Sequence, residues 1–339
     1  MRKITIVMLV AALTSLGLGA AARPAAAQEI VVKLGTSAPQ GSPWHNALKQ
    51  AANKWRDISG GKVALRVFPG GTMGDEGDMV QKMRIGQLQA AGLSTIGLHG
   101  ITPEPQALDM PLLVKNDAER ECLLSKMQPA LDKALSDKGF VVLTWSEIGY
   151  TYFFSNKARP TLDEMRTSKL FVWSGDPASK DAWASGGFKP VVLSAVDIVP
   201  SLTTGMIDTV VYTPTLILSL QADKYTKFMM DLPYSTLTGA TVIDKKTWDK
   251  IPADLQPKLR QVFIDLGVDG KQTTRKLEAE AVEKLKTKGL TVTHVTDTDK
   301  WTQEVARVRE LSKGKVVPAK TFDDVLRIVQ ECRKGQAAH

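Results

Sequence analysis

Two aromatic side chains with polar tips stand at the ends of predicted strands in the middle of the chain. Trp173 closes the apolar run Leu170–Trp173, and Tyr212 closes the strand that follows Gly205. Each side chain offers a large apolar body and one hydrogen-bonding group, which suits a pocket for a small organic molecule. The alternative for any one of them is a place in the core. We treat both as candidate ligand-binding residues.

Further aromatic residues gather close to these two, although aromatic residues are sparse in the chain as a whole. If the segment Tyr150–Phe154 is extended, its successive side chains must point to opposite faces, and one of those faces belongs to the core. Trp145 precedes this segment and Phe171 lies in the strand that ends at Trp173. We keep Trp145 and Phe171 as further candidates for ligand contact.

Residue sets that would support catalysis or metal binding are absent from the sequence. It contains no G-x-S-x-G, H-E-x-x-H, phosphate-binding P-loop or dinucleotide fingerprint. The four histidines do not have metal-ligand spacing, and Cys122 and Cys332 are too far apart for a CxxC site. The two cysteines either pair, which would join the last helix to the first lobe, or remain buried thiols. We expect no cofactor, no metal and no enzymatic activity.

A glycine-rich loop, Gly70–Gly74, precedes a helix that begins near Asp75 and Glu76. Backbone N–H groups in such a loop can face an anion. The simpler interpretation is a turn between a strand and a helix. Acidic residues at a helix start are also explained by the helix dipole, without any role in function.

Phe171, Trp173 and Tyr212 lie in a segment, residues 159–214, that reads as strand, helix, strand. This spacing is typical of a parallel crossover, and ligands bind to open α/β sheets in the loops after such strands. The other predicted elements are a β-α-β-α-β unit over residues 30–93, a crossing segment over Phe140–Phe154, a returning strand Thr238–Ile243, a long helical region Lys245–Lys288 and two closing helices.

The pattern predicts an α/β protein of two lobes, joined by crossing strands and a long connecting helix. We assign residues 28–149 with about 238–275 to lobe I. Residues 150–237 with about 276–335 form lobe II. About 310 residues suffice for two lobes of ordinary size.

Residues 1–27 read as a cleavable secretory signal peptide. Arg2 and Lys3 form its charged end, an apolar run follows, and Ala25–Ala27 supplies small residues at the cleavage site. An uncleaved membrane anchor is the alternative. Removal of three basic residues lowers the formal charge from +8 to +5 (8 − 3), and the remaining excess is dispersed. We therefore expect a periplasmic monomer that does not bind nucleic acid.

Four stretches in order resemble the solute-binding proteins of tripartite ATP-independent periplasmic (TRAP) transporters, of the dicarboxylate-binding DctP type. These are GGKVALRVFPGGTMGDEGDMVQKMRIGQLQAA, PEPQALDMPLL, TLDEMRTSKL and VDIVPSLTTGMIDTVVYTP, the last followed by Lys224 and Tyr225. The resemblance spans nearly the whole mature chain. It implies a two-lobed periplasmic binding protein fold, type II-like, that closes on a small molecule. It also implies delivery to TRAP membrane permease subunits driven by an ion gradient.

The resemblance implies where the ligand lies. Members of the family usually hold a substrate carboxylate with an arginine in a K-x-R step, which here reads Lys169–Leu170–Phe171. A second arginine of the family falls at Thr151, and its asparagine falls at Tyr212. The pocket positions of the first lobe fall on Ser37, Glu76 and Ser94.

Phenylalanine cannot make the paired, charge-assisted hydrogen bonds that arginine makes to a carboxylate. A carboxylate buried without such a partner loses hydration at a large cost. We therefore expect an aromatic or largely apolar ligand, not a plain C4-dicarboxylate. One alternative is that Arg166 or Lys169 supplies the missing cation. Another is a cationic ligand over Trp173 or Tyr212 with Glu76 nearby.

Two other classes of function remain open at this point. The protein could present its ligand-bound form to a membrane receptor as a sensor, or it could be an enzyme on the same scaffold. Neighbouring permease genes would favour transport over sensing, and turnover of a bound ligand would indicate an enzyme. The lack of any catalytic residue set disfavours the enzyme.

Overall fold

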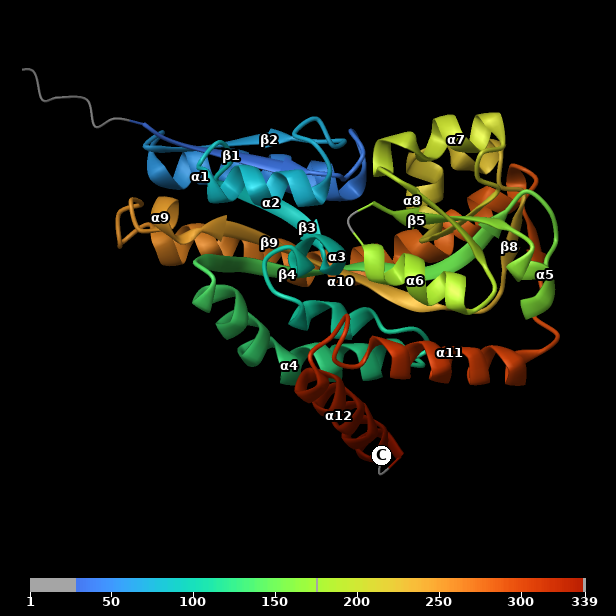
Figure 1. Ribbon diagram of the computed structural model, residues 1–339. Coiled ribbons are helices and arrows are strands. Elements are labelled where there is room, and N and C mark those ends of the chain that lie inside the picture. The colour runs from blue at the N-terminus through green and yellow to red at the C-terminus, as the bar shows by residue number, and fades with distance from the viewer. Residues whose placement is uncertain (1–28, 175, 338–339) are drawn as a thin grey trace, which may run out of the picture.

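A single β-sheet runs through both lobes of the protein (Figure 1). The computed structural model describes residues 29–174 and 176–337, so the predicted signal peptide lies outside the described residues. The strand order along the sheet is β2-β1-β3-β9-β4-β7-β5-β6, with β8 paired to β4 and β10 paired to β8. The strands are β1 (Ile30–Thr36), β2 (Val63–Phe68), β3 (Ala90–Ser94), β4 (Phe140–Ser155), β5 (Lys169–Trp173), β6 (Lys189–Leu193), β7 (Thr209–Tyr212), β8 (Phe228–Met230), β9 (Ser235–Asp244) and β10 (Thr291–Thr293).

Helices cover both faces of the sheet in each lobe (Figure 1). Those of the first lobe are α1 (Pro43–Ser59), α2 (Glu76–Arg84), α3 (Thr95–His99), α4 (Asp117–Asp137), α9 (Lys245–Trp248) and α12 (Ala319–Ala337). Those of the second lobe are α5 (Leu162–Arg166), α6 (Pro177–Ser185), α7 (Ile198–Thr204), α8 (Pro214–Ser219) and α11 (Thr298–Ser312). The long helix α10 (Gln256–Thr287) packs against α1 and β4 and also against α8, so it spans both lobes.

The predicted β-α-β-α-β unit of the first lobe is confirmed. Strands β1, β2 and β3 are parallel, and α1 and α2 connect them. Helix α1 begins where the Ser42 side chain accepts a hydrogen bond from the backbone N–H of His45 and ends at Gly60, which is left-handed. A cap of this kind satisfies donors that the first turn leaves unpaired, and a glycine tolerates the left-handed residue that ends the helix.

Strand β4 belongs to both lobes. Its first part pairs antiparallel with β9, from Phe140 opposite Asp244 to Thr151 opposite Ser235, and its last part pairs with β7, starting at Tyr152 opposite Tyr212. The sequence predicts a strand and a separate extended segment here, whereas the structure has one strand with two shifts of register. Strand β9 returns to the first lobe by pairing with β3, as predicted.

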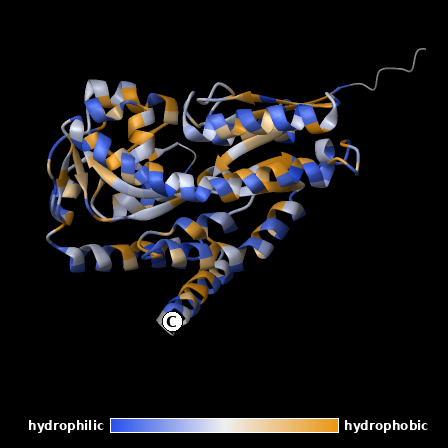
Figure 2. Ribbon diagram, turned by 180° about the vertical axis from the view of Figure 1, so that it is seen from behind, coloured by the Kyte–Doolittle hydropathy of each residue, from blue (hydrophilic) through white to orange (hydrophobic). Residues whose placement is uncertain are grey.

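Each lobe has an apolar core on both faces of the sheet. In the first lobe one cluster contains Trp55 and Phe263, and the other lies beneath α2, α4 and α12. In the second lobe Phe154 and Phe153, adjacent on β4, point into separate clusters, as neighbours on a strand must. Figure 2 shows the hydrophobic residues in the strands and on stripes of the helices. None of the helices within the described residues is both long and apolar enough to cross a bilayer.

Several short elements were not predicted from the sequence. They are α3, α6, α8, β8 and the break between α9 and α10. Helices α6 and α8 each begin with a proline after a capping residue, Asp176 and Thr213, whose side chain accepts a hydrogen bond from a backbone N–H. Elements of three to nine residues hold too few periods of apolar spacing for the pattern to reveal them.

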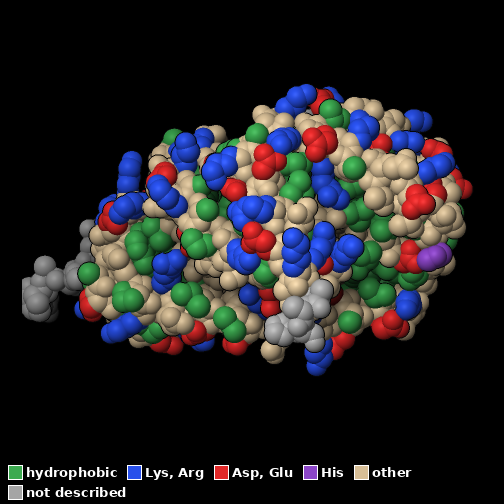
Figure 3. All heavy atoms as spheres, turned by 90° about the horizontal axis from the view of Figure 1, so that it is seen from below, with side chains coloured by type: hydrophobic (Ala, Val, Ile, Leu, Met, Phe, Trp, Pro, Cys, Tyr) green, Lys and Arg blue, Asp and Glu red, His purple; other side chains and the backbone are tan. Residues whose placement is uncertain are grey.

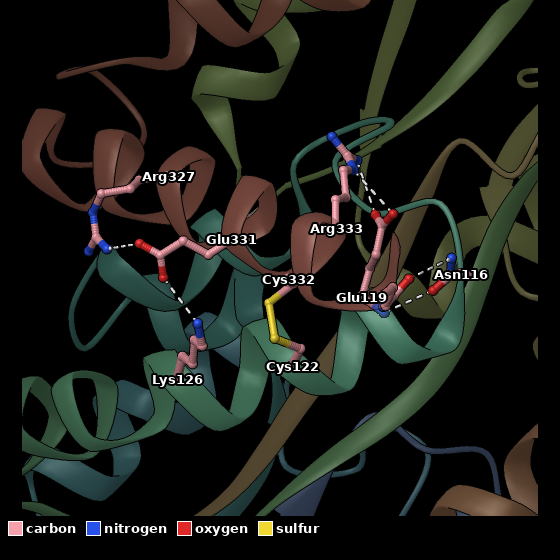
Figure 4. Close-up of a disulfide and its surroundings, with 9 residues drawn as sticks. Asn116, Glu119, Cys122, Lys126, Arg327, Glu331, Cys332 and Arg333 are labelled. Atoms are coloured by element: carbon pink, nitrogen blue, oxygen red, sulfur yellow. Dashed lines mark hydrogen bonds and ion pairs between the residues drawn. A yellow bond between two sulfur atoms is a disulfide. The ribbon is translucent and has the colours of Figure 1, made fainter. Parts of the chain in front are cut away.

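Helix α12 corrects the expected lobe boundary. The sequence places residues up to 335 in lobe II, but Phe322 and Val325 of α12 are buried in the cluster under α4 of the first lobe. Cys122 of α4 and Cys332 of α12 form a disulfide with Cα atoms 6.0 Å apart (Figure 4). Helix α11 stays with the second lobe, where Trp301 and Val305 are buried. The chain therefore crosses back to the first lobe between α11 and α12.

Ion pairs flank the disulfide on both sides (Figure 4). Lys126 of α4 lies 3.0 Å from Glu331 of α12, and Arg333 of α12 lies 3.0 Å from the largely buried Glu119 of α4. Viewed from below relative to Figure 1, the molecular surface carries basic and acidic side chains intermixed (Figure 3). The disulfide, the apolar contacts and these pairs together attach α12 to α4.

Removal of the disulfide should lower stability, because it closes a loop with a sequence separation of 210 residues. For Cys122→Ser/Cys332→Ser we expect a loss of about 2–4 kcal/mol, seen as a fall in Tm of several degrees in a thermal melt monitored by circular dichroism. A reductant should lower the Tm of the wild type but not of the variant. Equal melting points for the oxidised wild type and the variant would contradict this role.

Candidate ligand-binding cleft

A cavity of about 720 Å³ lies between the two lobes. The first lobe contributes residues from the loop after β1, from α1, from the Gly70–Glu76 loop and from β3. The second lobe contributes residues from the ends of β5 and β7 and from α7 and α8, while β4, β9 and α10 contribute residues from the connecting region. The volume is within the range of small-molecule sites. The loops after parallel strands therefore meet here, as the strand order predicts.

The charged residues that line this cavity are all acidic. Asp75, Glu76, Glu147 and Asp269 line it, and no arginine, lysine or histidine among the described residues does so. Glu147 is neutralised by Arg120 at 2.7 Å and by Arg275 at 3.2 Å, both of which approach from outside the cavity. Within residues 29–174 and 176–337 there is no group of histidine, cysteine and carboxylate side chains suited to a metal ion.

Asp75 joins the two lobes at the edge of the cavity. The indole Nε1 of Trp173 donates to Asp75 Oδ1 at 2.9 Å, and the hydroxyl of Ser174 donates to Oδ2 at 2.9 Å. The same carboxylate caps α2 by accepting from the backbone N–H of Glu76. A second polar contact between the lobes runs from Gln106 Nε2 to Asp176 Oδ2 at 3.0 Å. Trp173 thus uses its polar tip to bridge the lobes, while its apolar body lines the cavity.

Glu76 is buried at the start of α2 and also lines the cavity. Burial raises its pKa to about 7, although hydrogen bonds from the Ser94 hydroxyl (2.7 Å) and backbone N–H (3.0 Å) act in the opposite direction. Gly97 leaves the space that this carboxyl needs, because a Cβ at position 97 would collide with it. Glu76 and Ser94 therefore connect α2 to the β3–α3 turn and present a carboxyl that is easily protonated.

Tyr212 lines the cavity from the end of β7, and Phe171 supports it from behind. The two ring centroids are 6.1 Å apart, and Phe171 belongs to the core cluster of the second lobe without lining the cavity. Burial raises the pKa of Tyr212, and the nearby carboxyl groups of Glu76 and Asp75 raise it further. The tyrosine hydroxyl is therefore protonated at neutral pH.

Ser37, Glu76, Ser94, Trp173 and Tyr212 are brought together around the cavity, whereas three other candidates are not. Trp145 is packed in the core of the first lobe, where its Nε1 donates to Asp132 at 2.8 Å. The hydroxyl of Thr151 is within 2.8 Å of that of Ser235 on β9. Each of these side chains, like Phe171, points to the face of its strand that the neighbouring elements cover.

The two cations considered as substitutes for the family arginine are engaged elsewhere. Lys169 donates to the carbonyl of Gly205 at 2.8 Å, and Arg166 pairs with Asp163 at 2.9 Å and Glu304 at 3.2 Å. Neither residue lines the cavity.

Sequence reasoning missed the wall that α10 contributes. Its cavity-lining residues recur at helical spacing on one face: Phe263, Leu266, Gly267, Gly270, Thr273, Thr274 and Leu277, with Asp269 beside them. The available signal was a stripe of small and apolar residues on a helix long enough to span both lobes.

Behind the cavity, Glu278 of α10 lies where β4 passes between the lobes. Gly149 of β4 has φ +144°, and a Cβ there would lie 2.8 Å from the Glu278 carboxyl carbon. Glu278 Oε1 accepts a hydrogen bond from the backbone N–H of Thr215 at 3.3 Å. Burial raises the Glu278 pKa to about 7, which outweighs the opposite effect of hydrogen bonds from Thr215.

Replacing Asp75 with asparagine should loosen the contact between the lobes. Asparagine keeps the helix cap but loses the charge and the bond from Ser174, so we expect the ratio of closed to open molecules to fall by roughly tenfold. Small-angle scattering should show a larger radius of gyration for the ligand-free variant. Asp57→Asn, which removes the charge of an exposed aspartate of α1 in the first lobe, is the control. Identical scattering of Asp75→Asn and wild type would show that this carboxylate does not hold the lobes together.

Stability should fall as the pH rises from about 5 to 8. The folded pKa of Glu278 is raised from 4.5 to about 7, so the folded state holds a proton that the unfolded state has lost between these values. The contribution of this bound proton to the free energy of unfolding is full below pH 4.5 and disappears as the pH passes 7. Between pH 5 and 8, the free energy of unfolding measured with urea should change less in Glu278→Gln than in the wild type, by on the order of 1–3 kcal/mol. Glu280→Gln, on the exposed side of α10, is the control, and equal pH slopes for Glu278→Gln and wild type would contradict the prediction.

Comparison of sequences identifies relatives over most of the chain. The sialic acid-binding periplasmic protein SiaP of Vibrio cholerae is 25% identical over 267 residues, which cover 78% of this chain and 82% of SiaP. The C4-dicarboxylate-binding periplasmic protein DctP of Rhodobacter capsulatus is 21% identical over 274 residues, covering 80% and 82%.

Solved structures share the fold. A TRAP periplasmic solute-binding protein from Fusobacterium nucleatum, with bound sn-glycerol-3-phosphate, superimposes with a TM-score of 0.84 at 21% identity, covering 91% of this chain and 99% of the other. A second, from Xanthobacter autotrophicus with bound β-D-galacturonate, gives a TM-score of 0.81 at 19% identity, covering 88% and 99%. These likenesses agree with the predicted two-lobed α/β fold.

The model of the family described as bacterial extracellular solute-binding protein, family 7, matches residues 34–312. The predicted location outside the cytoplasm and the prediction of binding without catalysis are both confirmed by this match and by the periplasmic relatives. The chain belongs to family 7 of the bacterial extracellular solute-binding proteins, the DctP family of TRAP transporter solute-binding proteins.

Proposed function

We propose that this protein captures an aromatic or largely apolar solute between its lobes and delivers it to a TRAP-type permease driven by an ion gradient. The observation that carries the proposal is the charge of the cavity, whose lining residues within the described chain include four carboxylates and no basic side chain. Ser37, Glu76, Ser94, Trp173 and Tyr212 are the proposed ligand-binding set.

A dicarboxylate would find no counter-charge in this cavity. Its burial would require the loss of hydration of two negative groups beside Asp75 and Glu76, which costs several kcal/mol for each unpaired charge. Arg120 and Arg275 are both paired with the cavity-lining Glu147, and neither of them lines the cavity. Charge therefore disfavours the ligand that the name of the family suggests.

The apolar surface of the cavity favours the proposed class of ligand. Trp173, Val196, Val199, Leu216 and Leu220 line it from the second lobe, and Leu93, Phe263 and Leu266 line it from the other side. Burial of apolar ligand surface against these groups contributes roughly 25 cal/mol per Å². Proteins of this fold with bound galacturonate or orotic acid carry anionic ligands, so the cleft of this chain would differ from theirs in charge.

A thermal-shift screen tests the proposal. Aromatic or aliphatic neutral solutes should raise the Tm, because a ligand at 100 times its Kd adds about 2.7 kcal/mol to the stability of the folded state. Succinate and malate at the same concentration should leave it unchanged. Mass spectrometry of molecules that co-purify with the protein identifies the natural class. Micromolar binding of succinate would contradict the proposal.

A further inference from the structure

The cavity is extended along α10 rather than confined to the ends of the strands. Its lining residues on this helix run from Phe263 to Leu277. At 1.5 Å per residue, these 14 steps correspond to a wall about 21 Å long. Leu216 and Leu220 at α8, which packs against α10, line the same space. The cavity is therefore long and mostly apolar along this side.

Two glycines of α10 face the cavity, but they are there for different physical reasons. A Cβ at Gly267 would collide with the Thr144 hydroxyl and lie 3.3 Å from the carbonyl of Trp145, so this glycine lets α10 pack closely on β4. A Cβ at Gly270 would meet nothing within 4 Å. Glycine inside a helix is about 1 kcal/mol less favourable than alanine. Neither close packing nor a positive φ accounts for Gly270, whose absent side chain keeps the cavity open.

One neutral polar group of the cavity wall is left without a partner. Tyr212 lines the cavity, and its hydroxyl makes no hydrogen bond with the described residues. A ligand with a neutral carbonyl, amide or hydroxyl group can bond to this hydroxyl without bringing a charge next to Glu76.

We propose that the ligand is an elongated, uncharged amphipathic molecule. Its polar group bonds to the Tyr212 hydroxyl, and its hydrocarbon or aromatic body lies along α10 beside Gly270, which sets the length that the cavity accepts. This inference rests on the proposed function and deepens it, because it assigns the shape and the charge of the solute. Gly270 determines specificity, because its lack of a side chain leaves room in the cavity for a long ligand.

Two homologous series of probes test the proposal by isothermal titration calorimetry on the mature protein after removal of co-purified solutes. One series is the linear primary amides from butanamide to octanamide, and the other is the matching carboxylates. Amide affinity should rise roughly three- to fourfold for each methylene. Gly270→Leu should weaken octanamide at least tenfold and leave butanamide within twofold. Tyr212→Phe should weaken every amide by the same factor of about five.

The control is Gly77→Leu, because Gly77 is an exposed helical glycine of α2 whose Cβ would also meet nothing within 4 Å. This variant should bind both ends of the amide series as the wild type does. If Gly270→Leu does not fold, Gly270→Ala fills part of the same space and should show a smaller loss for octanamide alone.

The outcomes separate the inference from the proposed function. Amide affinity that does not depend on chain length, or an equal effect of Gly270→Leu on butanamide and octanamide, overturns the elongated ligand. Carboxylates that bind as tightly as amides overturn the proposed function itself. If neither series binds, the elongated uncharged ligand is wrong, and the screen of aromatic solutes decides the proposed function separately.

Discussion

The site depends on one strand that is shared by two lobes. The backbone of β4 is hydrogen-bonded to β9 along its first part and to β7 at its end, so the lobes cannot separate at this point without breaking a ladder. The ladder between β4 and β9 is interrupted at two register shifts, and the second of them ends at Gly149, where the backbone adopts a conformation that favours glycine. The cavity lies beside this strand, and α10 connects the same two lobes along its length.

Electrostatics then determine what the cleft can hold. Three of the four carboxylates at its wall already have partners: Asp75 accepts from donors of the second lobe, Glu76 is bonded to Ser94 and has a raised pKa, and Glu147 is paired with two arginines. Among the described residues, the cleft offers no basic side chain to an anionic ligand. An uncharged ligand can enter the cleft without leaving a buried charge unpaired.

Closure and helix capping are combined in a single side chain. Asp75 caps α2 and receives hydrogen bonds from Trp173 and Ser174 of the opposite lobe. The carboxylate is therefore positioned by local structure before the lobes meet, so that little further ordering is needed on closure. Trp173 contributes its indole N–H to this contact and its ring face to the cavity, which couples the contact between lobes to the surface that a ligand would touch.

The sequence by itself determined the order of the longer strands and helices, the crossing of β4, the return of β9 and the family, because periodicity and capping are local and the family motifs are contiguous. It also indicated Ser37, Glu76, Ser94, Trp173 and Tyr212 as residues of one pocket. Tertiary structure alone decided which face of β4 is covered, and therefore that Trp145 and Thr151 point away from the cavity. It also placed α12 on α4 with the disulfide and the Gly270 face of α10 on the cavity. Those outcomes depend on contacts between different elements of the chain, such as Thr151 with Ser235 or Cys122 with Cys332, which no local pattern encodes.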